Sequence, residues 1–250
     1  MSLEACAEKV ARGDPDRFAA TMAAPPDLRA RLWPLYAFNL EVARAPWVTA
    51  EPMIAEMRLQ WWRDVVAEPV PRAHEVAGPL HGLIREAGLP VEVLDRMVEA
   101  RRWDIYREAF EDRAAFDAYL EDTAGGLMWL AARATGAGPE AEAPARALGW
   151  AAGLAAFLRA VPELETRGRV PLVDGRPEAV AALAREGLGR LETARLGRRA
   201  IGPAGLAGWQ AGPLLSFAAA EPGRVAAGGL ALSEFSRRGR LLWAAATGRW

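Results

Sequence analysis

Apolar and polar residues follow a helical period along almost the whole chain. Leu28, Leu32, Leu35 and Val42, for example, are separated by three, four or seven residues, which places them on one face of a helix. No stretch keeps the two-residue alternation of a half-buried β-strand for long. The pattern predicts an all-α protein.

Prolines, glycines and capping residues divide this pattern into separate helices. Asp14 and Asp112 are expected to be N-caps, and Pro162 is expected to end a helix and open a loop that reaches Arg176. Helical stretches are predicted at 16–24, 28–45, 51–68, 74–87, 91–110, 113–136 and 140–161, with three more after Arg176. There is no obvious repeat or interdomain linker, so residues 1–250 are expected to form one domain.

Composition restricts the classes of function. The net charge is −1, whereas a nucleic-acid-binding protein normally has a basic excess, so no nucleic-acid partner is expected. Cys6 is the single cysteine, which excludes an intramolecular disulfide and suits a reducing compartment. Richness in alanine, glycine, proline and arginine is typical of a GC-rich genome. We therefore expect a bacterial cytoplasmic protein.

The N-terminal sequence does not resemble a signal peptide, and the apolar stretches are too short or too interrupted to span a membrane. Ten tryptophans are compatible with peripheral contact at the inner face of a membrane, although use in the core is favoured. His74 and His81 have no third ligand at a suitable spacing, so no protein-bound metal is expected.

Four segments in order suggest a family. These are LYAFNLEVA, EMRLQWWRDVV, DAYLEDTAGGLMWLA and AAFLRAVPELETRGRVPL, and together they extend through most of residues 16–172. In sequence and spacing they resemble the squalene/phytoene synthase family. AFNLEVA and MRLQWWRD also resemble the branch of this superfamily that contains a mitochondrial assembly factor for respiratory complex I.

The resemblance implies an isoprenoid-synthase-type helical bundle that joins two prenyl diphosphates head to head. It also implies two aspartate motifs that hold magnesium against the diphosphates, as expected for an ion that prefers carboxylate and phosphate oxygens. Aspartates would be expected near Ala43 and at Ala160 and Leu164, and this chain lacks them. A protein that has lost prenyl transfer, a pseudoenzyme, is the leading interpretation.

An active transferase with shifted acidic residues is the alternative. Glu163 and Glu165 would then act with Asp104, which the resemblance places in the pocket wall, and magnesium would be the cofactor. The simpler interpretation is that both glutamates are solvated charges in the loop after Pro162, and that no cofactor is bound.

Arginines concentrate where the aspartate motifs would face each other. A guanidinium can bind phosphate oxygens through two parallel hydrogen bonds, so this region could bind a prenyl or lipid-like anion directly. The competing interpretation is that these arginines are solvated or paired with nearby glutamates. The candidate ligand-binding residues are Arg44, Tyr119, Arg159, Arg167 and Arg169.

Two functions therefore remain for a non-catalytic protein. It could bind a prenyl or lipid-like anion without chemistry, or it could act as an assembly or accessory factor with a protein partner in a membrane complex. An open, apolar cavity between the segments of Ala43 and Ala160 would favour a lipid-like ligand. A cavity filled by Trp47, Phe157 and Leu164 would favour protein interaction.

Overall fold

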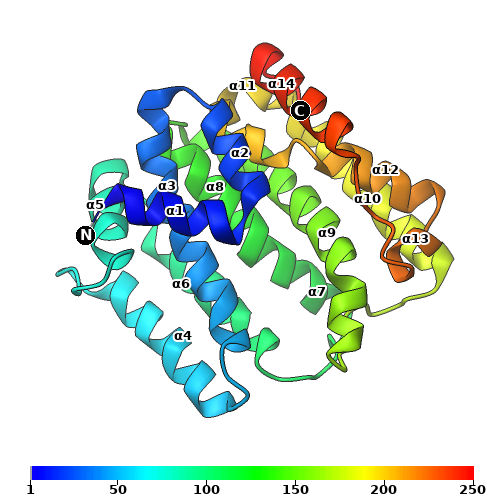
Figure 1. The fold of residues 1–250 in the computed structure, drawn as a ribbon, viewed down its shortest axis with the longest axis horizontal. Helices are drawn as coiled ribbons and strands as arrows, with labels where there is room; N and C mark the ends of the chain where they lie inside the picture. Colours follow the sequence, from blue (N-terminus) through cyan, green and yellow to red (C-terminus); the bar gives the residue numbers. More distant parts are fainter. Residues whose placement is uncertain (1) are drawn as a thin grey trace.

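Two long helices, α9 (Glu142–Thr166) and α10 (Pro177–Leu196), pack along each other (Figure 1). The structure is a computed structural model that describes residues 2–250. No β-strand occurs among these residues, which confirms the all-α prediction. Helix α8 (Gly126–Ala134) also packs on α9, and α12 (Ala211–Ala220) packs on α10.

The other helices precede and follow this pair along the chain. The first half contains α1 (Leu3–Gly13), α2 (Pro15–Ala23), α3 (Pro26–Arg44), η1 (Ala45–Trp47), α4 (Pro52–Ala67), α5 (Ala77–Ala87), α6 (Val91–Ala100), η2 (Arg101–Asp104) and α7 (Arg113–Leu120). The second half contains η3 (Glu121–Gly125), α8 (Gly126–Ala134), η4 (Pro139–Ala141), α11 (Arg198–Ile201), η5 (Gly202–Gly208), α12 (Ala211–Ala220), α13 (Gly223–Ala226) and α14 (Glu234–Thr247).

Local sequence explains where several helices begin. The carboxylate of Asp14 accepts a hydrogen bond from the Arg17 amide at 2.9 Å, and that of Asp112 accepts one from the Ala115 amide at 2.8 Å. Each bond satisfies a first-turn donor that has no partner within the helix. Both predicted N-caps are confirmed.

The predicted helix 91–110 is wrong beyond Ala100, where α6 ends and the short turn η2 follows. The physical reason is Arg169, whose guanidinium donates to the backbone carbonyls of Trp103 and Tyr106 at 3.2 and 2.8 Å, and to that of Asp104. A continuing α-helix would use such carbonyls for its own hydrogen bonds. A distant arginine has replaced those partners.

The predicted end of a helix at Pro162 is also wrong, because α9 continues to Thr166. Proline removes one backbone donor, but the turn after it is held by other bonds. The Thr166 hydroxyl donates to the Pro162 carbonyl at 2.8 Å, and Val161 and Leu164 are buried on either side. Continuation of α9 keeps Leu164 in a helical position.

Close packing of backbones occurs where α9 crosses η3. A Cβ atom on Gly149 would overlap the Ala124 carbonyl and lie 2.8 Å from Gly125 Cα, and one on Gly153 would overlap the Ala124 side chain. The backbones can approach this closely because glycine has no side chain. The stretch TAGG at 123–126 is thus a site of close helix packing.

The segment Pro139–Thr166, which contains η4 and α9, is long and apolar enough to cross a membrane by length and composition alone. Half of its most apolar 18-residue window is buried by neighbouring helices. Burial of this kind is the ordinary environment of a core helix in a globular fold.

Candidate functional site

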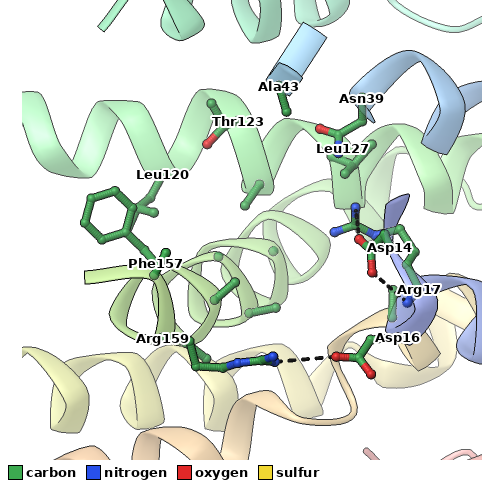
Figure 2. Close-up of a pocket in the computed structure, with 18 of the residues that line it drawn as sticks. Asp14, Asp16, Arg17, Asn39, Ala43, Leu120, Thr123, Leu127, Phe157 and Arg159 are labelled. Atoms are coloured by element: carbon green, nitrogen blue, oxygen red, sulfur yellow. Dashed lines mark hydrogen bonds and ion pairs between the residues drawn. The ribbon is translucent and has the colours of Figure 1, made fainter. Parts of the chain in front are cut away.

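A cavity of about 680 Å³ lies between α3, α7, η3, α8 and α9, with further walls from α2 and α12 (Figure 2). Its apolar wall includes Leu120, Leu127, Phe157 and Leu214. Polar side chains occur on several walls, and they are Asp14, Asp16, Arg17, Asn39, Arg101, Asp104, Tyr119, Thr123, Arg159 and Gln210. The site therefore combines an apolar wall with a mixed set of charges.

Helices α3 and α9 each present one face to the cavity. Asn39 and Ala43 are four residues apart on α3 and share a helix face. On α9 the same four-residue spacing relates Ala156, Ala160 and Leu164. Figure 2 shows Asn39 and Ala43 on one side of the cavity and Arg159 and Phe157 on another.

Three carboxylates line the cavity, and each is paired with an arginine. Asp14 Oδ2 forms an ion pair with Arg17 Nη1, at 2.9 Å. Asp16 pairs with Arg159 at 3.5 Å and with Arg237 of α14, and Asp104 pairs with Arg101 at 3.2 Å. The negative charge of the cavity is thus neutralised by the protein's own side chains.

Asp16 shows the electrostatic effect of this pairing. Burial alone would raise the pKa of its carboxyl, but a hydrogen bond from Gln210, a hydrogen bond from Arg237 and the charges of Arg237 and Arg159 outweigh burial. The pKa of Asp16 consequently lies below its ordinary value of 3.8. The ionised carboxylate is the form that bridges the two arginines.

A second polar cluster is formed by Arg101, Asp104 and Tyr119. The Tyr119 hydroxyl donates to Asp104 Oδ2 at 3.0 Å and accepts from Arg101 Nη1 at 2.7 Å. Burial, the largest cause, and the adjacent Asp104 carboxylate together raise the pKa of Tyr119 well above its ordinary value, against the effect of Arg101. Tyr119 therefore stays protonated and acts as a hydrogen-bond donor in the cavity wall.

Comparison with known proteins places this architecture in a family. The family model for squalene/phytoene synthase matches residues 10–206, which is most of the chain. The chain belongs to the squalene/phytoene synthase family. The match contains the whole range 16–172 on which the sequence resemblance rests and extends beyond it.

Solved structures share the fold. A dehydrosqualene synthase crystallised with a ligand superposes with a TM-score of 0.80 at 14% identity, covering 98% of this chain and 95% of that chain. The squalene synthase HpnC from Alicyclobacillus acidocaldarius gives a TM-score of 0.69 at 17% identity, covering 86% and 92%. At these identities the likeness concerns the fold, and it confirms the isoprenoid-synthase-type bundle.

Curated relatives belong to another branch of the family. The mouse NADH dehydrogenase (ubiquinone) complex I assembly factor 6 is 26% identical over 169 residues, or 66% of this chain and 51% of that protein. The Drosophila melanogaster homologue is 31% identical over 178 residues, or 67% and 53%. The chain therefore spans about half the length of these relatives. The resemblance to the assembly-factor branch is confirmed.

The acidic residues of the transferase alternative lie in different environments. Glu163 and Glu165 are exposed and are not part of the cavity lining, and Glu163 pairs with Arg167 at 2.7 Å. Asp104 is buried and lines the cavity, within the cluster described above. The structure does not bring these three carboxylates together at the cavity.

The predicted ligand-binding residues are also divided. Arg159 and Tyr119 line the cavity, whereas Arg44 is exposed outside the lining. Arg167 and Arg169 both lie over the Trp47 ring, at 4.9 Å from its centroid, and neither belongs to the lining. Arg169 is buried with its donors directed at backbone carbonyls, which indicates a structural role for this side chain.

Sequence reasoning missed Arg17 and Arg101, which both line the cavity. The sequence could have identified Arg17, because it follows the Asp14 cap by three residues and therefore lies beside it on the first turn. Arg101 could have been noticed as the partner of Asp104, three residues later in the same segment. Neither spacing shows by itself that the side chain faces a cavity.

The family resemblance implies a magnesium site at this cavity. Magnesium is usually held by carboxylates that are free to coordinate it together with substrate phosphates. Here Ala43, Ala160 and Leu164 stand at the cavity wall, and Asp14, Asp16 and Asp104 are each bound to arginine. Across residues 2–250 no three His, Cys, Asp or Glu side chains converge in a way that could hold a metal. The residues present do not fit this metal site.

Proposed function

We propose that this member of the squalene/phytoene synthase family is a non-catalytic accessory factor for the assembly of a respiratory NADH dehydrogenase, and that it binds an isoprenoid or lipid-like anion. One observation carries the proposal. At the two places where the resemblance implies metal-binding aspartates, Ala43 and Ala160 line an open cavity that also contains arginine. The family scaffold is retained without its metal ligands.

The shape of the cavity supports a lipid-like ligand. Its volume of about 680 Å³ falls within the range of roughly 300–1,000 Å³ that is usual for small-molecule sites. Trp47, Phe157 and Leu164 border the cavity without filling it. An apolar chain would pack against Leu120, Leu127 and Phe157, which all line the cavity; Figure 2 shows Leu120 beside Phe157, and Leu127 on the side of Asn39.

The charges of the cavity support an anionic head group. Arg17, Arg101 and Arg159 line the cavity, and each guanidinium has five N–H donors, more than its carboxylate contact uses. Charge-assisted bonds from arginine to phosphate are among the stronger hydrogen bonds in proteins. These residues would hold the head group without a metal ion.

The relatives support the assembly role. The proteins that match at 26–31% identity in mouse and Drosophila melanogaster are complex I assembly factors, and their similarity to this chain extends over about two thirds of it. A respiratory-complex protein is accordingly the proposed partner. The proposed location is the cytoplasm, at the inner face of the membrane that carries the complex.

The test is genetic and uses a cavity-blocking variant. In a strain lacking the gene, native gels should show reduced assembled NADH dehydrogenase, and the wild-type gene should restore it. Ala160→Phe, which places a ring at the cavity wall, should restore less, whereas Ala182→Phe on the exposed side of α10 should restore fully. Normal assembly in the deletion strain would refute the proposal.

A second candidate, prenyl transfer, is favoured by one observation, the superposition on a dehydrosqualene synthase over 98% of this chain. It would require Glu163 and Glu165, which are exposed outside the cavity, to move into it together with magnesium. The two candidates differ in one readily measured property, which is metal-dependent release of diphosphate.

A further inference from the structure

Helix α14 has an apolar stripe that points away from the rest of the protein. Phe235, Leu242 and Ala246 are separated by seven and four residues and therefore lie on one helix face. Phe235 is 90% exposed and Leu242 is 72% exposed. A surface helix normally turns its apolar stripe toward the core. An exposed stripe is instead typical of a site that contacts another molecule or a membrane.

The opposite face of α14 is the one that contacts the protein. Ala244 is its buried residue, and Leu241 packs beside it on a small cluster formed by α2 and η5. Ala244 follows Leu242 by two residues, which corresponds to about 200° around a helix. The exposed stripe is thus directed away from the core, and in Figure 1 α14 lies at the edge of the molecule.

The charges around the stripe favour one kind of partner. Helix α14 contains three arginines and one glutamate, and that glutamate already pairs with Arg237 and Arg238. The Arg238 side chain is 86% exposed, and Arg240 and Arg249 are exposed as well. The surface beside the apolar stripe is therefore basic, which complements anionic phospholipid head groups.

A tryptophan lies at the border of the stripe. Trp243 is 60% exposed and directly follows Leu242. Tryptophan prefers the interface between lipid and water, where the ring is in an apolar region and its N–H reaches a polar one. An apolar stripe, a bordering tryptophan and flanking arginines together are the features of a helix that lies in a membrane surface.

We propose that α14 docks this protein on an anionic lipid bilayer, with Phe235 and Leu242 inserted among the acyl chains and the arginines at the head groups. Arg237, on the protein side of the helix, pairs with Asp16 in the cavity wall. The cavity wall is thereby attached to the helix that contacts the membrane. This inference goes beyond the proposed function and does not depend on it, since it requires neither a cavity ligand nor a protein partner.

Co-sedimentation of the 250-residue protein with vesicles tests the proposal. The protein should bind phosphatidylcholine vesicles that contain phosphatidylglycerol and bind poorly to phosphatidylcholine alone, and added salt should weaken binding. Phe235→Ser with Leu242→Ser should lower the apparent partition coefficient by about tenfold or more. Arg238→Gln with Arg240→Gln should remove most of the preference for phosphatidylglycerol.

A matched control is available on α4, where Met53 and Met57 are 76% and 66% exposed. Met53→Ser with Met57→Ser removes a similar exposed apolar area and should bind vesicles like the wild type. All substituted side chains are exposed, and circular dichroism would verify the fold of each variant.

Absence of wild-type binding to phosphatidylglycerol vesicles would overturn the proposal. An equal loss of binding in the α4 control would also overturn it. So would a wild-type dimer that becomes monomeric in the Phe235→Ser, Leu242→Ser variant, because the stripe would then be an interface between copies of the chain.

Discussion

Arg159 and Asp16 are 143 residues apart in the sequence, and Arg159 Nη1 lies 3.5 Å from Asp16 Oδ2 at the wall of the cavity (Figure 2). Arg237 contacts the same carboxylate from α14. Asp16 thus links α2, α9 and α14 around one site. It also neutralises a guanidinium where the family resemblance would place metal ligands.

This link predicts a pH-dependent contribution to stability. Because the native pKa of Asp16 lies below its ordinary value of 3.8, the ionised carboxylate stabilises the fold above that pH, and the contribution is lost as the pH falls through the native pKa. Asp16→Asn should lower the free energy of unfolding by about 1 kcal/mol at neutral pH, since solvent screens a partly exposed pair. Urea unfolding at a series of pH values would measure the difference.

The difference between wild type and Asp16→Asn should shrink in the acid range below pH 3.8. Glu165→Gln, which removes an exposed carboxylate from α9, is the matched control and should leave neutral-pH stability unchanged. A difference that is constant from neutral to acid pH would contradict the assignment of the effect to the Asp16 charge.

Close packing at Gly149 predicts a large loss of stability on substitution. Gly149→Ala would force a methyl group against the Ala124 carbonyl and Gly125 Cα, so the free energy of unfolding should fall by about 2–3 kcal/mol. Gly189→Ala on α10 meets open space and should stabilise the protein by up to about 1 kcal/mol, the helix propensity of alanine over glycine. Thermal and urea unfolding would measure the stability of both variants. Equal changes in the free energy of unfolding for Gly149→Ala and Gly189→Ala would contradict the close packing at Gly149.

The buried cluster predicts unequal effects of its members. Asp104→Ala should destabilise the protein by about 3 kcal/mol, because it leaves the Arg101 guanidinium partly buried without its carboxylate. Tyr119→Phe removes one hydroxyl and should cost about 1 kcal/mol. Urea unfolding would test the order, and a Tyr119→Phe loss larger than that of Asp104→Ala would contradict the account of the cluster.

The cavity arginines predict metal-independent binding of an anion. Farnesyl phosphate should bind in the presence of EDTA, and Arg159→Ala should weaken binding about tenfold through loss of a charge-assisted contact. Arg167→Ala is the control, because Arg167 lies outside the lining and pairs with Glu163. Isothermal titration calorimetry would compare the three proteins. Equal weakening in both variants would argue against binding at the cavity.

Much of the fold could be predicted from the chain. The helix pattern predicts the all-α class, the Asp14 and Asp112 caps are local, and the order of four segments suggests the family. Local rules did not predict the end of α6 at Ala100. The backbone carbonyl of Asp104, in the turn that follows, is bound by the side chain of Arg169, which is 65 residues further along the chain. Helix boundaries set by tertiary contacts leave no local signal.

The candidate site was less accessible to sequence reasoning. The positions of Ala43, Ala160 and Leu164 follow from the resemblance, and all three line the cavity. The roles of the arginines do not follow from the resemblance. Arg159 and Arg169 are ten residues apart, yet Arg159 faces the cavity and Arg169 is bound to backbone carbonyls. Residue type and spacing cannot distinguish these two environments, because each depends on helices from distant parts of the chain.

The most direct test of the central claim is diphosphate release from farnesyl or geranylgeranyl diphosphate by the folded protein, with and without magnesium or manganese, together with analysis of extracted products. We predict no metal-dependent release and no condensed hydrocarbon, because the cavity residues do not fit the magnesium site. Metal-dependent release with a condensed hydrocarbon, abolished by Glu163→Gln or Glu165→Gln, would contradict the claim and show that the protein is a prenyl transferase.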